Sequence, residues 1–357
     1  MATESFDDDL QAYDYDLPRE LIAQEPLANR SDARLLVVDR LEQTLEHAYV
    51  RDLPNILRAG DVVVVNDSKV IAARLVGFRT ATRGRWEGLF LREDGQGIAE
   101  LLGKTRGKLQ IGEQVTLRDF DGRESARLVV LGFSGDGKIL MRPEPVEPWP
   151  GILERCGRVP LPPYIRDGIM LDEDRVRYQT VFARTAGSVA APTAGLHFTP
   201  DLIQRLRQAG LALVSVTLHV GLGTFRPIQT QRLSEHLMHH EFGEISEAVV
   251  KRLNLSKAEG GRTIAVGTTS VRVLETAAAQ AADGKLAAWS GDTDLFIKPG
   301  HRFRAVDGLL TNFHLPKSSL LVLVSTFAGH ELMKRAYHEA IQQRYRFYSY
   351  GDCMLIL

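Results

Sequence analysis

The sequence predicts an α/β main domain with a mixed or mostly parallel sheet, and a small all-β, barrel-like domain inserted into it. After Arg175, apolar runs alternate with amphipathic runs of helical period, which is typical of strands and helices packed in layers. Between Val76 and Pro145 the apolar runs are short, closely spaced and separated by glycine turns, which favours a small barrel or sandwich. We therefore expect an α/β catalytic domain of residues 1–75 and 146–357, and an inserted all-β domain of residues 76–145.

Composition and charge restrict the classes of protein to which this chain could belong. A chain of 357 residues with 44% hydrophobic residues is long enough to form two cores. Its net charge of -1 does not indicate a nucleic acid or an anionic membrane as a partner, so any such partner would have to bind a local basic patch. Cys156 and Cys353 are far apart in the sequence, which favours a reducing compartment over a disulfide framework. The N-terminus lacks the pattern of a signal peptide, and no apolar run reaches the roughly 18 residues of a membrane span. We expect a cytoplasmic protein with no membrane partner.

The N-terminal half predicts strands. Asp61–Val65 is a β-branched run followed by the turn residues Asn66, Asp67 and Ser68. Four further short runs predict strands of the inserted domain: Trp86–Leu91, Gln114–Leu117, Ala126–Val130 and Ile139–Met141. Seven of the 15 prolines then fall between Pro143 and Pro163, which we interpret as the return to the main domain.

The C-terminal half predicts alternating helices and strands. Thr199 is placed to cap a helix over Pro200–Gly210, because Pro suits the first helical position and Gly the end. The same criteria predict strands at Leu211–Val220, Thr263–Val266 and Leu320–Val324, and helices at Glu247–Glu259, Val271–Ala282 and Ala328–Gln343.

A segment rich in small residues, Gly187–Thr199, leads directly into the first of these helices. Its small side chains let a ligand approach the backbone, and the helix N-terminus favours an anion. Thr193, Gly195 and His197 are therefore candidate binding residues. A capped loop without a ligand is the competing interpretation.

A second strand–turn–helix junction lies at Gly267, Thr268 and Thr269. Its hydroxyl and main-chain N–H groups suit an anion, and Arg272 is able to clamp a carboxylate with two hydrogen bonds. A plain helix cap with a surface arginine is the alternative.

Gly221-Leu222-Gly223-Thr224 follows a predicted strand. It lacks the third glycine and the immediate helix of a dinucleotide-binding loop, and the chain has no GxxxxGK[ST] motif. Glycines after a buried strand still suit an edge of the sheet that faces a ligand.

Histidines concentrate in the same half, since nine of ten follow Gly187. His236, His239 and His240 lack an HExxH context, so we expect no metal site. Two other segments carry polar residues beside apolar runs. These are Thr293–Ile297 with Asp294, and Thr311–Ser319 with Asn312, His314 and Lys317.

Two segments suit nucleic acid. Lys104, Arg106 and Lys108 form a basic glycine loop, and Arg344–Tyr350 interleaves cations with aromatic residues. Each is equally typical of a solvated turn or a helix end.

Together these segments resemble the S-adenosylmethionine:tRNA ribosyltransferase-isomerase family of the queuosine pathway. The resemblance begins at Tyr15-Asp16-Leu17-Pro18 and covers nearly the whole chain. Its further blocks are Leu21–Gln24, Gly60-Asp61, Asn66-Asp67, Arg177–Val181, Gly187–Thr199, Leu218–Phe225, Met238–Glu241, Ala265–Arg272, Thr293–Phe296, Asp307–Ser319 and Tyr350–Leu357.

The resemblance implies transfer of the ribosyl part of S-adenosylmethionine to the 7-aminomethyl-7-deazaguanine wobble base of a tRNA with a GUN anticodon. Adenine and methionine leave, and epoxyqueuosine is formed. S-adenosylmethionine is a co-substrate here, so no other cofactor and no metal is expected. We further expect a monomer.

On these blocks we assign roles as hypotheses. The base is His219 or His314, with Asp294 as the carboxylate alternative. The expected substrate-binding residues are Thr193, Gly195, His197, Gly221, Gly223, Thr224, Thr268, Thr269, Arg272, Asn312 and Asp352. Among them, Thr268, Thr269 and Arg272 would hold the methionine carboxylate. Asp352 would stabilise the positive charge of the sulfonium or of the substrate amine. The expected tRNA-binding residues are Lys104, Arg106, Lys108, Lys317, Arg344, Arg346 and Tyr348.

The chain departs from the family pattern at a few positions: Ser68-Lys69 in place of Thr-Arg, Gly243 in place of a larger residue, and Lys298 and His301 in place of aromatic residues. Three alternatives remain open at this point. They are a non-catalytic RNA-binding protein, an S-adenosylmethionine-dependent methyltransferase and a histidine-rich metallohydrolase.

Overall fold

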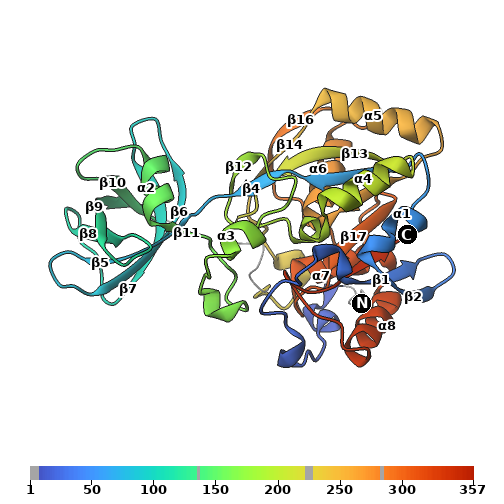
Figure 1. Cartoon of the computed structure of the whole chain (residues 1–357), viewed down its shortest axis with the longest axis horizontal. Helices are drawn as coiled ribbons and strands as arrows, with labels where there is room; N and C mark the ends of the chain where they lie inside the picture. Colours follow the sequence, from blue (N-terminus) through green and yellow to red (C-terminus); the bar gives the residue numbers. More distant parts are fainter. Residues whose placement is uncertain (1–7, 135–136, 222–227, 282–284) are drawn as a thin grey trace, which may run out of the picture. The chain divides into compact units, whose positions relative to one another are not determined.

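The computed structural model describes residues 8–134, 137–221, 228–281 and 285–357. The chain forms two compact units, shown in Figure 1. The first contains residues 1–69, 164–167 and 177–357, and the second residues 70–163 and 168–176. Within the described ranges, no helix is long and apolar enough to cross a membrane.

The first unit is built on a nine-stranded mixed sheet in the order β16-β14-β13-β3-β15-β17-β18-β1-β2. Its four central strands, β13, β3, β15 and β17, run parallel to one another, and antiparallel pairs flank them. The strands are β1 (Arg34–Asp39), β2 (Thr44–Tyr49), β3 (Val62–Asn66), β13 (Ala212–Leu218), β14 (Glu241–Ile245), β15 (Thr263–Val266), β16 (Trp289–Thr293), β17 (Gly308–Asn312) and β18 (Cys353–Ile356). A separate pair is formed by β4 (Ser68–Val70) and β12 (Thr185–Ser188).

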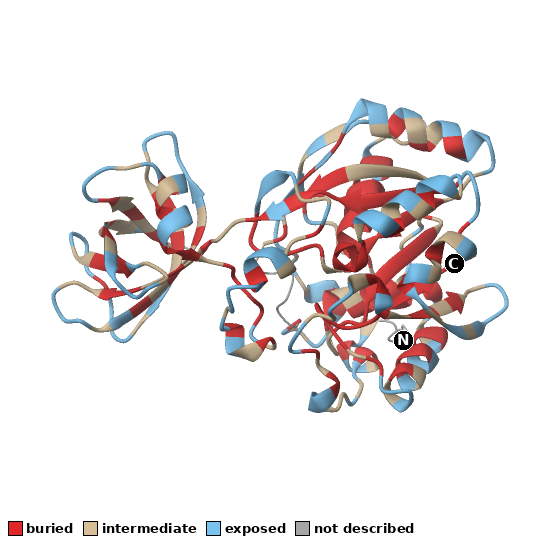
Figure 2. Ribbon diagram, viewed as in Figure 1, coloured by how far each residue is buried: buried red, intermediate tan, exposed pale blue. Residues whose placement is uncertain are grey.

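Helices cover both faces of this sheet, so its central strands are buried (Figure 2). On β3, Val62 and Val64 belong to one apolar cluster, whereas Val63 and Val65 belong to another, because successive side chains point to opposite faces. The first cluster is covered by α5 (Glu247–Ala258), α6 (Gly267–Gln280), α7 (Ser319–Ala328) and α8 (His330–Gln342). The second is covered by α1 (Leu53–Ile56), α4 (Pro200–Gln208) and the short helix η7 (Thr193–His197). The predicted α/β layer architecture is confirmed.

Most predicted elements of the C-terminal half are present. In α4, the Thr199 hydroxyl accepts a hydrogen bond from the Leu202 N–H at 3.2 Å, as its sequence position predicts. The strand predicted at Leu320–Val324 is wrong, because these residues belong to α7. An apolar run that is buried on all sides has no period to distinguish strand from helix. The Ser318 cap, which accepts from the Leu321 N–H at 3.2 Å, starts the helix instead.

The second unit is an antiparallel barrel in the order β5-β6-β7-β10-β9-β8, which the pairing of β5 with β8 closes. The predicted inserted all-β domain is therefore present. Its strands are β5 (Arg74–Arg79), β6 (Arg85–Glu93), β7 (Ala99–Thr105), β8 (Gln114–Arg118), β9 (Glu124–Phe133), β10 (Ile139–Pro143) and, beside β5, β11 (Gly157–Arg158).

This second unit extends beyond the expected range 76–145. Helix α2 (Trp149–Cys156) buries Trp149, Ile152 and Cys156, and β11 pairs with β5. The proline-rich segment is thus part of the barrel's core rather than a simple return to the main domain. A further short α-helix, α3 (Asp174–Arg177), follows later in the chain.

Candidate active site

A cavity lies in the first unit where the central parallel strands end. Val220 follows β13, Gly267 follows β15 directly, and Asn312 is the last residue of β17. Because the carboxyl ends of parallel strands share one edge of a sheet, the loops that follow them meet there. The cavity is lined by Tyr164, Ala191, Pro192, Thr193, Ala194, Val220, Gly267, Thr268, Thr269, Thr311, Asn312, Phe313, His314, Leu315, Ser318, Leu320, Tyr348 and Ser349.

The N-terminus of α6 forms one wall of this cavity. Gly267 adopts a positive φ of 84°, which lets the chain turn from β15 directly into the helix. Among the described residues, no side chain caps this helix end. Thr268 and Thr269 are buried in its first turn, and the Thr269 hydroxyl has no hydrogen-bond partner among the described residues. A free hydroxyl at an uncapped helix N-terminus is suited to an anionic ligand.

Asn312 presents an unpaired acceptor to the same cavity. The two hydrogens of its side-chain NH2 group are shared among three acceptors, which are the main-chain oxygens of Tyr348 (3.1 Å) and Asp352 (3.3 Å) and His197 Nε2 (3.2 Å). Because two carbonyls must receive N–H groups, they determine which end of the amide carries nitrogen. Oδ1 is buried and has no partner in the described part of the chain, so it is available to a donor on a ligand.

His197 lies behind Asn312 and does not line the cavity. Its side chain is buried, and desolvation lowers its pKa to about 4. A neutral imidazole is consistent with Nε2 accepting from the Asn312 amide. We expected His197 in the substrate pocket, whereas in the structure it contacts the lining residue Asn312 from outside the cavity.

His314 is the only histidine among the described residues that line the cavity. Its Nε2 atom lies 2.8 Å from the Thr311 hydroxyl. Its main chain is held from both sides: the N–H donates to the Tyr337 phenol at 2.9 Å, and the carbonyl accepts from the Tyr15 phenol. Burial lowers the pKa of His314 to about 3, so its imidazole is neutral at physiological pH.

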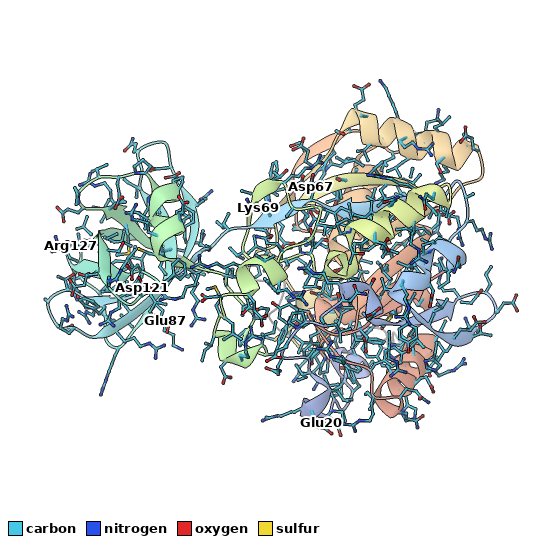
Figure 3. The ribbon with its side chains drawn as sticks, viewed as in Figure 1. Glu20, Asp67, Lys69, Glu87, Asp121 and Arg127 are labelled. Carbon is cyan, nitrogen blue, oxygen red and sulfur yellow. The ribbon has the colours of Figure 1, made fainter. Side chains whose placement is uncertain are left out.

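His219 precedes the lining residue Val220 at the end of β13, but it does not line the cavity itself. Its Nδ1 atom lies 2.7 Å from the Ser68 hydroxyl, and its ring stacks on Phe242 at 5.9 Å between centroids. Nε2 faces Gly187, where a Cβ atom would come within 2.8 Å, and finds no hydrogen-bond partner in the described ranges. Burial lowers the pKa of His219, although the nearby Asp67 carboxylate opposes this shift. Asp67 is labelled in Figure 3.

Arg272 does not reach the cavity. It is buried, forms an ion pair with Glu241, and donates to the main-chain oxygens of Leu295 (3.2 Å) and Thr293 (3.3 Å). Glu241 in turn accepts from the Gly221 N–H at 2.7 Å. The guanidinium that we expected to clamp a methionine carboxylate therefore connects α6 to β14, to the last residue of β16 and to Leu295 beyond it.

Several other expected site residues lie away from the cavity. Asp294 is exposed, and Gly195 is buried inside η7. Asp352 is buried and accepts from the main-chain N–H groups of Arg34 (2.9 Å) and Arg346 (2.8 Å), while desolvation raises its pKa. Gly223 and Thr224 lie outside the described residues.

The expected tRNA contacts fall into three groups. Lys104, Arg106 and Lys108 are exposed on the second unit, and Arg344 is exposed on the first. The remaining two basic residues already have protein partners: Lys317 pairs with Asp14 at 2.7 Å, and Arg346 donates to the Glu25 carbonyl. The seventh residue, Tyr348, is buried and lines the cavity.

Three tyrosines at or beside the cavity were not predicted as site residues from the sequence. Tyr164 lines the cavity, and its phenol lies 2.7 Å from the Ser349 hydroxyl. Tyr15 and Tyr337 hold the main chain of His314. The only sequence signal was that Tyr15 opens the first block of the family resemblance.

In the part of the chain that the structure describes, no group of three His, Cys, Asp or Glu side chains is arranged to hold a metal ion.

Known proteins are similar to this chain in sequence and in fold. Residues 10–356 match the family described as Queuosine biosynthesis protein. A protein of Symbiobacterium thermophilum named S-adenosylmethionine:tRNA ribosyltransferase-isomerase is 49% identical over 348 residues, which cover 98% of this chain and 99% of that protein. A protein of the same name from Xanthomonas oryzae is 47% identical over 360 residues, covering 96% of this chain and 95% of that protein.

A solved structure gives the same result. The crystal structure of S-adenosylmethionine tRNA ribosyltransferase from Thermotoga maritima is 35% identical, with a TM-score of 0.55, and the match covers 97% of this chain and 100% of that one. The sequence match therefore includes the strands, loops and helix that form the cavity as well as the barrel. On this evidence, the chain belongs to the queuosine biosynthesis protein family.

Proposed function

We propose that this protein transfers and isomerises the ribosyl part of S-adenosylmethionine onto the 7-aminomethyl-7-deazaguanine wobble base of tRNA. The products are epoxyqueuosine in tRNA, adenine and methionine. The observation that carries the proposal is the name shared by relatives 47–49% identical over nearly their whole length. A partly aromatic cavity at the carboxyl ends of parallel strands, where α/β proteins bind small ligands, adds support.

The chemistry of the substrate explains why side chains alone suffice. The positive sulfur of S-adenosylmethionine makes the adjacent C5′ hydrogens acidic, so a general base starts the reaction by removing one of them. Adenine and methionine both leave from the co-substrate itself. The transfer therefore needs no external oxidant or reductant, and we propose no cofactor beyond S-adenosylmethionine.

His219 is the first candidate for the general base. Its lowered pKa keeps the imidazole neutral, and when Nδ1–H donates to Ser68 the unpaired Nε2 atom is able to accept a proton. His314 lines the cavity, but a pKa of about 3 makes it a weak acceptor. Asp294 remains the carboxylate alternative.

Alanine variants at His219, His314 and Asp294 test this order. We expect His219→Ala to reduce the rate of adenine release by roughly 100-fold or more, as loss of a general base does. If adenine release stays within a few-fold of wild type in all three variants, none of them is the base.

We further propose that the protein acts as a cytoplasmic monomer on tRNAs with a GUN anticodon. The exposed cations Lys104, Arg106 and Lys108 on the barrel and Arg344 on the first unit are suited to backbone phosphates. Tyr348, Arg346 and Lys317 are engaged inside the first unit, so we propose a smaller part in RNA binding for them.

Product analysis tests the function as a whole. Purified protein is incubated with S-adenosylmethionine and tRNA carrying the deazaguanine precursor, and the small molecules are separated by chromatography. We expect adenine and methionine in equal amounts, dependent on the modified tRNA. Formation of S-adenosylhomocysteine instead would identify a methyltransferase and contradict the proposal.

A further inference from the structure

Two of the residues that line the cavity carry buried, unsatisfied polar groups of opposite character. The Thr269 hydroxyl, able to donate, and Asn312 Oδ1, able only to accept, are both buried and have no partner among the described residues. Buried polar groups are nearly always paired in folded proteins. Two such groups in one cavity therefore indicate a ligand that brings an acceptor to one and a donor to the other.

The two groups come from neighbouring strands. Thr269 lies in the first turn of α6, directly after β15, and Asn312 ends β17. These strands are parallel neighbours, with Val266 opposite Leu310. Thr269 and Asn312 therefore lie at the same edge of the sheet and line one cavity, so a single small ligand with an acceptor and a donor is suited to both.

The charge of the cavity restricts the ligand further. None of the described residues that line it is Asp, Glu, Lys or Arg, and burial keeps His314 neutral with a pKa of about 3. A phosphate dianion or a lone cation would find no counter-charge there, and burying an unpaired ion is costly. An anion and a cation carried on one carbon cancel each other, and the uncapped N-terminus of α6 favours the anion.

We propose that this cavity holds the α-amino-acid end of S-adenosylmethionine, with its carboxylate at the N-terminus of α6 and the Thr269 hydroxyl and its ammonium group on Asn312 Oδ1. This placement rests on the proposed function. In this placement uncharged groups bind the methionine carboxylate, which we had expected Arg272 to help hold. Tyr164 and Tyr348 line the same cavity with their ring centroids 4.8 Å apart, and aromatic rings suit the positive sulfur that lies further along the chain of the ligand.

Two analogues of the ligand test the proposal on the unaltered protein. The 3-aminopropyl analogue lacks the carboxylate, and the 3-carboxypropyl analogue lacks the amine; both keep the adenosine and the sulfonium. By isothermal titration we expect each to bind at least about tenfold more weakly than S-adenosylmethionine, because hydrogen bonds to charged groups are lost. If both analogues bind as tightly as S-adenosylmethionine, the placement is overturned.

Thr269→Val removes only the hydroxyl and keeps the shape of the side chain. We expect it to weaken S-adenosylmethionine about tenfold and the 3-aminopropyl analogue less than twofold. The matched control is Ser270→Ala on the same turn, because the Ser270 hydroxyl already donates to the Val266 carbonyl at 2.8 Å and does not line the cavity. The control leaves both affinities unchanged. Equal weakening of both ligands by Thr269→Val would place the hydroxyl against adenosine and overturn the assignment.

Asn312→Ala tests the ammonium half. It should weaken S-adenosylmethionine about tenfold and the 3-carboxypropyl analogue less than twofold, and equal weakening of both would contradict the assignment. If this variant does not fold, because its amide also holds Tyr348 and Asp352, the analogue comparison on the unaltered protein decides. Failure of the unaltered protein to bind S-adenosylmethionine at all would instead overturn the proposed function itself.

Discussion

At the scale of single residues, two buried histidines link the site to pH. His197 and His314 have pKa values of about 4 and about 3 because burial disfavours their charged forms. Their pKa values in the unfolded chain are near 6.5, so between pH 6.5 and 4 the unfolded state binds more protons than the folded state. The stability that these neutral imidazoles contribute is therefore complete above pH 6.5 and is lost as the pH falls.

We expect the free energy of unfolding, measured by urea titration at several pH values, to fall by up to about 1.4 kcal/mol per pH unit for each histidine below pH 6. His197→Gln should reduce this slope by about one proton. His338→Gln, which changes an exposed side chain, should leave the slope unchanged. Equal slopes for His197→Gln and the unaltered protein would show that His197 is not held neutral.

The buried pair of Arg272 and Glu241 makes a second prediction at this scale. Replacing Arg272 with Met leaves the Glu241 carboxylate buried without its partner, which costs about 3–5 kcal/mol. Adding Glu241→Gln should recover part of this loss, because the neutral amide still accepts from Gly221. If Arg272→Met instead unfolds like the unaltered protein but fails to bind S-adenosylmethionine, the guanidinium holds the ligand as the sequence first suggested.

At the scale of elements, the cap of α4 can be tested directly. Thr199→Ala removes the hydrogen bond to the Leu202 N–H and should lower the free energy of unfolding by about 1 kcal/mol. Thr199→Ser keeps the hydroxyl and serves as the control. A loss of equal size in both variants would mean that the methyl group of Thr199, rather than its cap, stabilises this helix.

The sequence could predict features that depend on neighbouring residues, but not those that depend on partners far away in the chain. Caps and glycines determine α4, and strand ends followed by polar residues drew attention to Thr268, Asn312 and His314, which line one cavity in the structure. The partners of Arg272 and Asp352 lie far away in the chain, so their engagement was not visible in local patterns. The same holds for the clamp on His314, which depends on Tyr15, 299 residues away.

At the scale of the whole molecule, the barrel and the first unit should contribute separable functions. Arg106 lies on the connection that precedes β8, and Arg123 on the turn that follows it, so the two lie near opposite ends of one strand. We expect Arg106→Glu to weaken tRNA binding and reduce its salt dependence, with S-adenosylmethionine affinity unchanged. Arg123→Glu, the matched charge reversal, should leave tRNA affinity as it is, and equal losses in the two variants would speak against a specific contact by the Arg106 loop.

The proposed activity is defined by which part of S-adenosylmethionine reaches the tRNA. The most direct measurement uses co-substrate labelled with one isotope in the ribose and another in the methyl group, together with tRNA carrying the deazaguanine precursor. We predict that the ribose label appears in the tRNA in proportion to the adenine released, while the methyl label leaves with methionine. Methyl label in the tRNA without ribose label would contradict the account.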